Sequence, residues 1–223
     1  MKDNNSAFNS NEYDKKIKDT LPYYEEFYNQ ITDVVNIYYN NRPVDWLDIG
    51  CGTGKMAEVA FQKSGIGRFV FCDSSLEMLN ASKERFNFGK EEYIASDVQD
   101  INFKNEFDVV TAVQVMHYLK SDERAYAIKK CYEALKPEGV FINFENFAPK
   151  GSMSEKLYLM RWKNYQISMG KSYEESEKHI KRYKKEYYPI SVSEQLDVLK
   201  KCGFREVEIL WLSYMQVGIM GIK

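Results

Sequence analysis

Apolar residues in this chain fall into two patterns, which alternate along the sequence. Short continuous runs predict strands that are buried on both faces. Stripes with intervals of three or four residues, such as Leu76, Leu79 and Phe86, predict helices between them. Repeated strand–helix–strand units favour an α/β fold with a doubly wound, mostly parallel sheet and right-handed crossovers. The predicted strands are residues 44–49, 68–72, 92–95, 107–113 and 140–144.

The end of the chain departs from this alternation. Ser191 and Glu194 have the spacing of a capping box, and Gly203 is placed to end the helix that follows it. Two extended runs, 204–212 and 214–222, come next with one residue between them, so they are expected to form an antiparallel hairpin. The whole pattern predicts a seven-stranded sheet that ends in this hairpin.

Two helical segments lie outside the predicted sheet. Residues 12–40 carry an aromatic and aliphatic stripe, and residues 147–190 form an insertion after the fifth strand. Capping-box spacings at Ser152/Glu155 and Ser172/Glu175 predict two helices in the insertion. An insertion at the carboxyl edge of a parallel sheet covers the ligand crevice, so we interpret it as a lid; a stabilising surface excursion is the alternative. We expect one domain over 1–223: N-terminal cap 12–40, core 44–146, lid 147–190, and final helix and hairpin 191–223.

Composition and charge narrow the class of protein. The 223 residues carry a net charge of −2, which does not steer the chain toward nucleic acid or anionic lipid. No apolar run reaches the roughly 18 residues of a membrane span, and residues 1–6 lack the apolar core of a signal peptide. The four cysteines are widely spaced without a CxxC pair. We therefore expect a reduced, cytoplasmic protein that binds no metal and no membrane.

The first strand leads into a glycine-rich loop, Asp48-Ile49-Gly50-Cys51-Gly52-Thr53-Gly54. Glycines allow a tight turn and a close approach of the backbone to a ligand, and a helix that begins near Gly54 directs its free N–H groups to the same place. A phosphate-binding P-loop would need Gly at Ile49 and Ser or Thr at Met56, while a dinucleotide loop would need Gly at Lys55. The loop therefore predicts a different nucleoside cofactor; a glycine-rich turn without a ligand is the alternative.

The pattern Asp48-x-Gly50-x-Gly52-x-Gly54 resembles motif I of the class I S-adenosylmethionine-dependent methyltransferases. The resemblance runs from about Tyr13 to Lys223 and implies S-adenosyl-L-methionine as cofactor, with S-adenosyl-L-homocysteine as product. In that family the acid that closes the second strand, here Asp73, binds the ribose hydroxyls, and the acid after the third strand, here Asp97, binds the adenine amino group. A helix N-cap and a solvated loop acid are the respective alternatives. The resemblance gives as cofactor-binding residues Tyr13, Asp48, Gly50, Cys51, Gly52, Gly54, Asp73, Ser74, Met78, Asp97, Val98 and Gln114.

The cofactor determines what the protein must add to the reaction. A sulfonium makes its methyl group electrophilic, so the protein has to hold a nucleophile in line with it and exclude water. A general base is needed only for a nucleophile that arrives protonated. His117 follows the fourth strand and is the candidate base, because imidazole titrates near neutrality; a packing role is the alternative. His179 is expected on a solvated face of an inserted helix.

The methyl acceptor is expected to be a small molecule, because the chain lacks the Asn-Pro-Pro-Tyr type motif of amino-directed DNA and RNA methyltransferases. Aromatic residues of the cap and lid could wall an apolar or aromatic pocket; a place in the core is the alternative. Residues 178–185 are basic, but glutamates flank them and a helix would place Ile180, Tyr183 and Tyr187 on one stripe. A solvated face is therefore favoured over a nucleic-acid surface. A methyltransferase for RNA or protein, and a non-catalytic protein that binds the cofactor or its product, are the alternatives. The acceptor, the atom methylated and the oligomeric state stay open.

Overall fold

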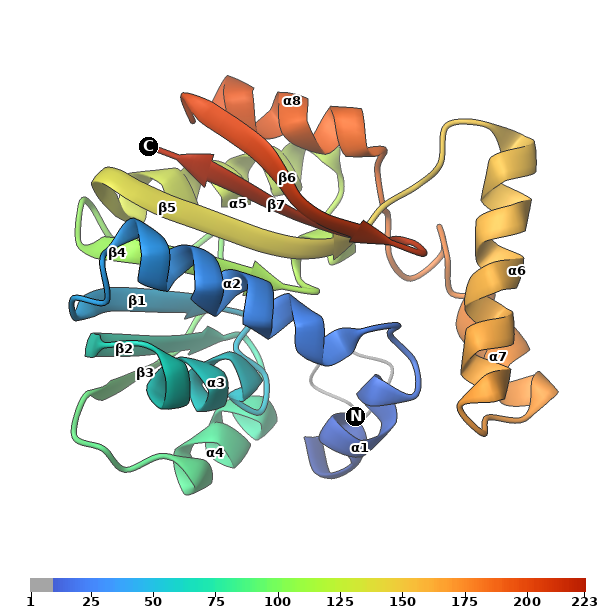
Figure 1. The fold of residues 1–223 in the computed structure, drawn as a ribbon, viewed down its shortest axis with the longest axis horizontal. Coiled ribbons are helices and arrows are strands. Elements are labelled where there is room, and N and C mark those ends of the chain that lie inside the picture. Colours follow the sequence, from blue (N-terminus) through green and yellow to red (C-terminus); the bar gives the residue numbers. More distant parts are fainter. Residues whose placement is uncertain (1–9) are drawn as a thin grey trace.

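The computed structural model describes residues 10–223, which form a seven-stranded sheet in the order β3-β2-β1-β4-β5-β7-β6 (Figure 1). Strands β1 to β5 are parallel, and β7 runs antiparallel to both β5 and β6. The predicted mostly parallel sheet that ends in an antiparallel hairpin is confirmed. The strands are β1 (Val44–Ile49), β2 (Ile66–Asp73), β3 (Glu91–Ala95), β4 (Phe107–Val113), β5 (Leu135–Asn146), β6 (Glu206–Ser213) and β7 (Gln216–Ile222).

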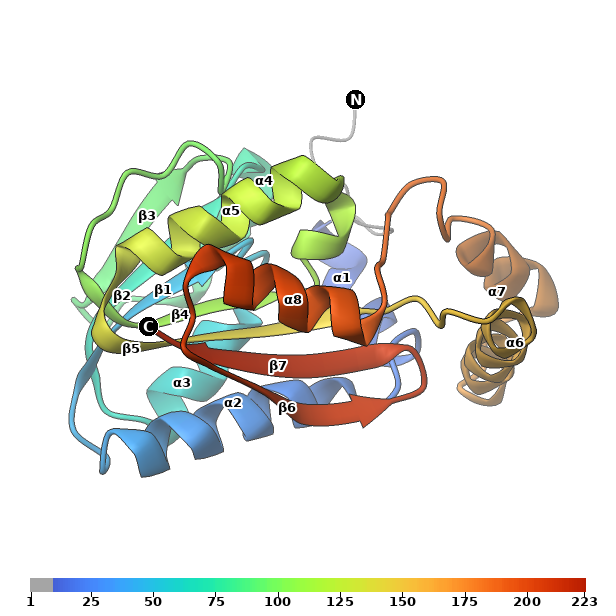
Figure 2. The same ribbon diagram turned by 90° about the horizontal axis from the view of Figure 1, so that it is seen from above.

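Helices cover both faces of the sheet. Figure 2 shows α2 and α3 on one face and α5 and α8 on the other, while α6 and α7 project beyond the carboxyl ends of the parallel strands. The doubly wound arrangement is the one that the alternating pattern predicted. The helices are α1 (Ser10–Lys18), α2 (Tyr24–Tyr38), α3 (Lys55–Lys63), α4 (Leu76–Arg85), the 3-10 turn η1 (Met116–Tyr118), α5 (Ser121–Ala134), α6 (Ser152–Ser168), α7 (Tyr173–Ile180) and α8 (Val192–Cys202).

The core lies in two layers because successive side chains of each strand point to opposite faces. Trp46 and Phe69 belong to the layer beneath α2 and α3, and their neighbours Leu47 and Val70 belong to the layer beneath α5 and α8. Both layers are needed to bury these strands, which explains their continuous apolar runs. One predicted core residue is wrong: Leu76 is 60% exposed, since it lies at the free first turn of α4.

The fifth strand begins earlier than the sequence predicts. Phe107 of β4 pairs with Leu135, whereas Val109 pairs with Val140, so residues 136–139 bulge out of the ladder. Glu138 has a left-handed φ of 65° at this bulge. The predicted start of this strand at residue 140 is therefore too late, and residues 136–139 form a loop within the bounds of β5.

The N-terminal extension consists of two helices instead of one continuous stretch. Pro22 has no N–H group and disfavours a helical conformation in the residue before it, and Tyr23 adopts a left-handed φ of 57°. The break places α1 near the carboxyl edge of the sheet, while α2 packs on the sheet with Phe27 and Ile31 buried. Residues 1–9, which include the segment examined for a signal peptide, lie outside the described part.

The insertion contains two helices, as predicted, but only one of its two capping boxes forms. The hydroxyl of Ser172 accepts from the Glu175 N–H at 3.1 Å and the Glu175 carboxylate accepts from the Ser172 N–H at 2.9 Å. The box at Ser152 is wrong, because Ser152 is the first residue of α6 and Gly151 holds the cap position. After α7 the chain leaves the helical conformation at Lys181, so the helix predicted to continue through Tyr187 is also wrong. The Ser191–Glu194 box and the Gly203 stop of α8 are confirmed.

Candidate functional site

A cavity lies at the carboxyl ends of β1, β2 and β4, and the glycine loop forms part of its wall. Gly50 and Gly52 have left-handed φ values of 62° and 54°, which side chains with a Cβ rarely adopt. A Cβ at Gly50 would lie 2.4 Å from Val115 Cγ2, so this glycine is required for packing. A Cβ at Gly52 would meet nothing within 4 Å. Gly52 therefore exposes its backbone directly to the space that a ligand would fill.

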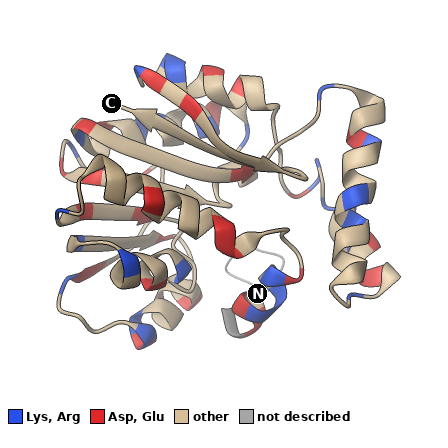
Figure 3. Cartoon of the chain, viewed as in Figure 1, with Lys and Arg blue, Asp and Glu red and all other residues tan. Residues whose placement is uncertain are grey.

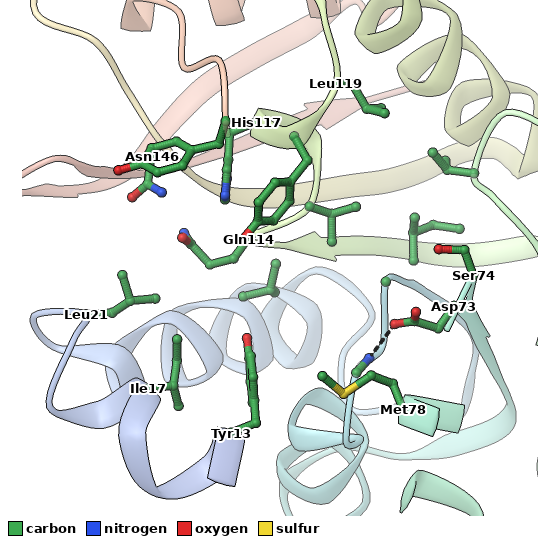
Figure 4. Close-up of a pocket in the computed structure, with 18 of the residues that line it drawn as sticks. Tyr13, Ile17, Leu21, Asp73, Ser74, Met78, Gln114, His117, Leu119 and Asn146 are labelled. Carbon is green, nitrogen blue, oxygen red and sulfur yellow. Dashed lines mark hydrogen bonds between the residues drawn. The ribbon is translucent and has the colours of Figure 1, made fainter. Parts of the chain in front are cut away.

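Asp73 is fixed at the rim of the glycine loop. Its Oδ2 accepts from the Gly52 N–H at 2.9 Å, drawn as the dashed line in Figure 4, and its Oδ1 accepts from the Ser75 N–H at 2.9 Å. The hydroxyl of Ser75, accepting from the Met78 N–H at 3.1 Å, caps α4. The N-cap of this helix is therefore Ser75, and Asp73 presents an acceptor to the cavity.

Most of the residues expected to bind the cofactor line this one cavity. Figure 4 shows the ring of Tyr13 pointing into it from α1, opposite Gln114 and His117. The expected residues on its wall are Tyr13, Gly50, Gly52, Asp73, Ser74, Met78, Asp97, Val98 and Gln114, together with His117. The structure places Asp48, Cys51 and Gly54 behind that wall. Gly54 supports packing there, because a Cβ would lie 2.5 Å from Phe86 Cε2.

Asp48 is buried beneath the glycine loop, with 3% of its surface exposed. Its Oδ1 accepts from the Thr111 hydroxyl at 2.7 Å, and the same hydroxyl accepts from Trp46 Nε1 at 2.9 Å. Burial raises the pKa of Asp48 to about 7; the Thr111 hydrogen bond opposes the shift and the charge of Asp73 adds to it. Asp48 therefore ties β1 to β4 under the loop.

His117 lies on η1, directly after β4, and forms a buried pair with Glu145 at the end of β5. Its Nδ1 is 2.6 Å from Glu145 Oε2, and both side chains are 3% exposed. Because a carboxylate only accepts hydrogen bonds, this contact assigns a proton to Nδ1, and in the imidazole tautomer with that proton Nε2 carries the lone pair. Sequence reasoning missed Glu145; its one signal is a carboxylate inside the apolar run that forms β5.

The lid is fastened to the N-terminal segment across the mouth of the cavity. Trp162 Nε1 of α6 donates to the Thr20 carbonyl at 2.6 Å, and the Tyr165 hydroxyl donates to the Lys18 carbonyl at 3.3 Å. The ammonium of Lys171 contacts the Thr20 hydroxyl. These bonds join parts of the chain that are far apart in sequence, and they bring Thr20 and Trp162 together on the wall of the cavity.

The expectation that His179 occupies a solvated face is wrong. His179 lines the cavity edge-on to the Trp162 ring, with 5.2 Å between ring centroids. Burial, together with the nearby charges of Lys171 and Arg182, lowers the pKa of His179 to about 3, so the imidazole is neutral. Because α7 ends at Ile180, the next segment turns Arg182 and Tyr187 toward the same cavity.

The described surface carries both signs of charge on its elements. Figure 3 shows Lys and Arg interspersed with Asp and Glu along the helices and connecting loops. Arg182, from the basic run 178–185, donates from Nε to Glu186 Oε2 at 2.5 Å. Among the helices formed by residues 10–223, none combines the length and apolar character that crossing a membrane requires.

Comparison with known proteins finds a methyltransferase domain within the chain. Residues 47–139, which include the glycine loop, Asp73, Asp97 and His117, match the model of the methyltransferase domain. This match supports the class I S-adenosylmethionine-dependent methyltransferase family, whose motif I the glycine loop resembles. Carboxy-S-adenosyl-L-methionine synthase of Staphylococcus epidermidis is 22% identical over 216 residues, or 96% of this chain and 93% of the relative. The synthase of the same name from Nautilia profundicola is 25% identical and covers 89% of this chain and 85% of its own.

Solved structures share the fold of this chain. The YcgJ protein of Bacillus subtilis has a TM-score of 0.65 at 13% identity, covering 90% of this chain and 99% of its own. Phosphoethanolamine N-methyltransferase 2 of Haemonchus contortus, solved with S-adenosyl-L-methionine, has a TM-score of 0.59 at 23% identity and covers 81% of this chain and 38% of its own.

S-adenosylmethionine is the cofactor of this methyltransferase family, and the cavity has the chemistry to hold it. The open backbone at Gly52 leaves room for the nucleoside, and the fixed carboxylate of Asp73 can accept from a ribose diol. Asp97 would accept from the adenine amino group, and Met78 and Val98 would provide apolar contacts for the ring. The cofactor residues that the sequence singled out thus converge on a surface suited to a nucleoside.

Proposed function

We propose that this methyltransferase transfers the methyl group of S-adenosylmethionine to a small-molecule acceptor bound between His117 and the lid. One observation carries the proposal: the cavity is continuous from the glycine loop and Asp73 to His117, Trp162 and His179. The bond from Trp162 to the Thr20 carbonyl closes its far side. A closed space of this kind favours a small molecule over a protein or RNA acceptor.

Bound S-adenosylmethionine supplies an electrophilic methyl group, and the chain's own residues orient the acceptor toward it. Gly52 and Asp73 hold the cofactor, while Leu21, Trp162 and Tyr187 exclude water. Positioning of two reactants in this way contributes roughly 7–11 kcal/mol to catalysis. His117 takes the proton of an acceptor hydroxyl, amine or thiol at Nε2, a role worth about 10²- to 10⁴-fold in rate.

The wall of the cavity favours a particular kind of acceptor. Tyr118, Trp162 and Tyr187 provide aromatic surface, and the neutral His179 provides a polar group without charge. Arg182 adds a guanidinium, which suits a carboxylate or another anionic group. We therefore propose an aromatic or partly apolar acceptor that carries a polar substituent, with nucleic acid and membrane disfavoured as partners. The cytoplasmic location stays a prediction.

Formation of carboxy-S-adenosylmethionine is a second candidate. The relatives from Staphylococcus epidermidis and Nautilia profundicola, matched along most of their length, carry the name of that synthase. Arg182 supports this candidate as well, because a carboxylate-bearing co-substrate needs a cation in the cavity. In this case the product would be the cofactor with an added carboxyl group, and no acceptor would be methylated.

Mass spectrometry of the cofactor-derived product distinguishes these functions. The purified protein is incubated with S-adenosylmethionine and, separately, with small phenols, amines and thiols, or with carboxylic acids that can supply a carboxyl group. Appearance of S-adenosylhomocysteine together with a methylated acceptor supports methyl transfer. A cofactor heavier by the mass of CO2, in which a carboxyl group replaces one hydrogen, supports the second candidate. Tight binding without either product would contradict both and favour a non-catalytic cofactor-binding protein.

His117→Gln tests the proposed base within the same assay. Gln retains a polar side chain, so we expect affinity for S-adenosylmethionine to change less than threefold. Its amide cannot act as a base near neutrality. Turnover with a protonated acceptor is expected to fall by about 10²-fold or more. Unchanged turnover would show that His117 is not the base. Lys178→Gln, which changes an exposed residue of α7, serves as the control.

A further inference from the structure

A small cavity lies behind the His117–Glu145 pair, on the side away from the cofactor. It has a volume of about 10 Å³, and its wall is formed by side chains from β5, α5, α8 and η1. Three polar groups face it from three different elements: Arg124 of α5, Asn143 of β5 and Gln195 of α8. The cavity also adjoins both Glu145 and His117.

Each of these three residues has a buried polar atom that forms no hydrogen bond within residues 10–223. The atoms are Arg124 Nη1, Asn143 Oδ1 and Gln195 Oε1. A buried polar group left unsatisfied costs about 1–3 kcal/mol, so three of them around one cavity require an explanation. The volume of about 10 Å³ is close to the least that accommodates one water molecule.

The chemistry of the three atoms matches a water molecule. Arg124 Nη1 is a donor, whereas Asn143 Oδ1 and Gln195 Oε1 are acceptors. A water molecule accepts one hydrogen bond from the guanidinium and donates its two hydrogens to the two amide oxygens. An anion would face two carbonyl-type oxygens, and a metal cation would face the positive charge of Arg124. Water is the occupant that satisfies all three groups.

This cavity supports the backbone turn that carries His117. Glu145 accepts from the N–H groups of Val115, Met116 and His117 at 3.2, 2.9 and 3.0 Å. Arg124 binds the carbonyl groups of the same turn, donating to Met116 at 2.9 Å and to Leu119 at 3.0 Å. The turn is thus held through its N–H groups from one side and through its carbonyl groups from the other.

We propose that one buried water, bound by Arg124 Nη1, Asn143 Oδ1 and Gln195 Oε1, completes a support that positions His117 through Glu145. In this support Glu145 keeps the imidazole proton on Nδ1, so that Nε2 faces the cofactor cavity as an acceptor. Arg124, Asn143 and Glu145 are positioning residues. The catalytic consequence rests on the proposed base role of His117, whereas the water site and the tautomer of His117 do not.

The water and the tautomer are tested first on the unmodified protein. A crystal structure at high resolution is expected to show one water within hydrogen-bonding distance of all three atoms. Long-range ¹H–¹⁵N correlation spectra are expected to show His117 protonated on Nδ1. A site that holds no water would overturn the first part, and a proton on Nε2 would overturn the second. Neither measurement requires turnover, so both remain decisive if the proposed methyl transfer fails.

Asn143→Leu tests whether the water acts on His117. Leucine has the same number and branching of side-chain heavy atoms as asparagine but no acceptor, whereas the variant Asn143→Asp keeps Oδ1. We expect Asn143→Leu to lose the water, to reduce the Nδ1-protonated fraction of His117 and to lower kcat about tenfold, the scale of one lost hydrogen bond. KM for S-adenosylmethionine should stay within about twofold, because the cofactor contacts lie elsewhere. Loss of the water with an unchanged His117 spectrum would overturn the positioning role.

Glu145→Gln addresses the tautomer directly. Glutamine must direct its NH₂ group either at two backbone N–H groups or at the His117 N–H and Nδ1, so it cannot accept from all of its present donors. We expect His117 to shift toward protonation on Nε2 and the pH profile of kcat to change. His179 lies in the lid and serves as the internal control in the same spectra. An unchanged His117 signal in a folded Glu145→Gln protein would contradict the assignment.

Discussion

Asp48 and Asp73 end neighbouring parallel strands, yet their surroundings give them different chemistry. Asp73 accepts from two backbone N–H groups at the edge of the cavity, which stabilises a carboxylate there. Asp48 has a hydroxyl as its hydrogen-bond partner and lies in the core, where a charge is poorly solvated. Sequence position alone therefore does not decide which acid of the motif contacts a ligand.

Asp73→Ala is expected to weaken S-adenosylmethionine binding at least tenfold. Removing a charged hydrogen bond to the ribose diol costs roughly 1.5–3 kcal/mol, and the variant also releases the Gly52 N–H. Calorimetric titration measures the dissociation constant. Asp45→Ala is the matched control, because Asp45 lies at the other end of β1 and pairs with Lys136. An affinity that Asp73→Ala leaves unchanged would show that this carboxylate does not hold the cofactor.

Asp48 is expected to make stability depend on pH. Its pKa is about 7 in the folded protein against 3.8 for the ordinary group, so the folded state binds the proton more tightly. The contribution of Asp48 to the free energy of unfolding is fully present below about pH 4 and is lost as pH rises through 7. The total loss is up to about 4 kcal/mol. Urea unfolding at pH 5 and pH 8 measures the loss. Asp48→Asn keeps an acceptor for Thr111 but does not titrate. In this variant the difference in the free energy of unfolding between pH 5 and pH 8 should be smaller than in the unmodified protein. An equal difference in both proteins would contradict the assignment.

At the scale of elements, the sequence predicted the bounds of the parallel strands better than those of the segments around them. The continuous apolar run 107–113 gave the bounds of β4 without error, because both of its faces are buried. The helix predicted through Tyr187 ends at Ile180 instead, since residues 181–187 gain more by burying Tyr183 and Tyr187 than by continuing α7. Helical periodicity could not reveal this, because the competing contacts come from η1 and α6.

Trp162→Phe tests the bond that fastens the lid to the N-terminal segment. Phenylalanine keeps most of the apolar packing but removes the donor to the Thr20 carbonyl. One hydrogen bond contributes about 0.5–1.5 kcal/mol, so we expect kcat/KM for the acceptor to fall by about twofold to tenfold. Hydrogen exchange in residues 152–168 and 17–21 should become faster. Met160→Ala, on the exposed face of α6, is the control and should leave both unchanged. If hydrogen exchange in these segments is as slow in Trp162→Phe as in the unmodified protein, the lid does not depend on this bond.

At the scale of the whole molecule, one cavity is built by segments from most of the chain. The N-terminal segment contributes Tyr13 and Leu21, the core contributes Asp73 and His117, and the lid contributes Trp162. A ligand that contacts all three parts binds only when they are assembled. Ligand binding should therefore stabilise the N-terminal segment, the core and the lid together against unfolding, and not only one of them.

Thermal unfolding is expected to report this linkage. At a concentration one hundred times the dissociation constant, a ligand adds about 2.7 kcal/mol to the free energy of unfolding. S-adenosylmethionine and S-adenosylhomocysteine should raise Tm by several degrees, and NADH should not, because Lys55 replaces the third glycine of a dinucleotide loop. Scanning fluorimetry with the three ligands makes the comparison. Stabilisation by NADH alone would contradict the assignment of the glycine loop.

The sequence by itself determined the strands and helices of the sheet and their order along the chain, and with the family resemblance it singled out most of the cofactor residues expected on the cavity wall, because these depend on local periodicity and on a motif whose geometry is short-range. Tertiary structure decided what depends on contacts between distant segments. It brought Glu145 to His117 across 28 positions, turned His179 and Arg182 inward, and buried Asp48 beneath the loop that it begins. Whether a polar residue is solvated, paired or buried is determined by its neighbours in space, which the linear pattern does not contain.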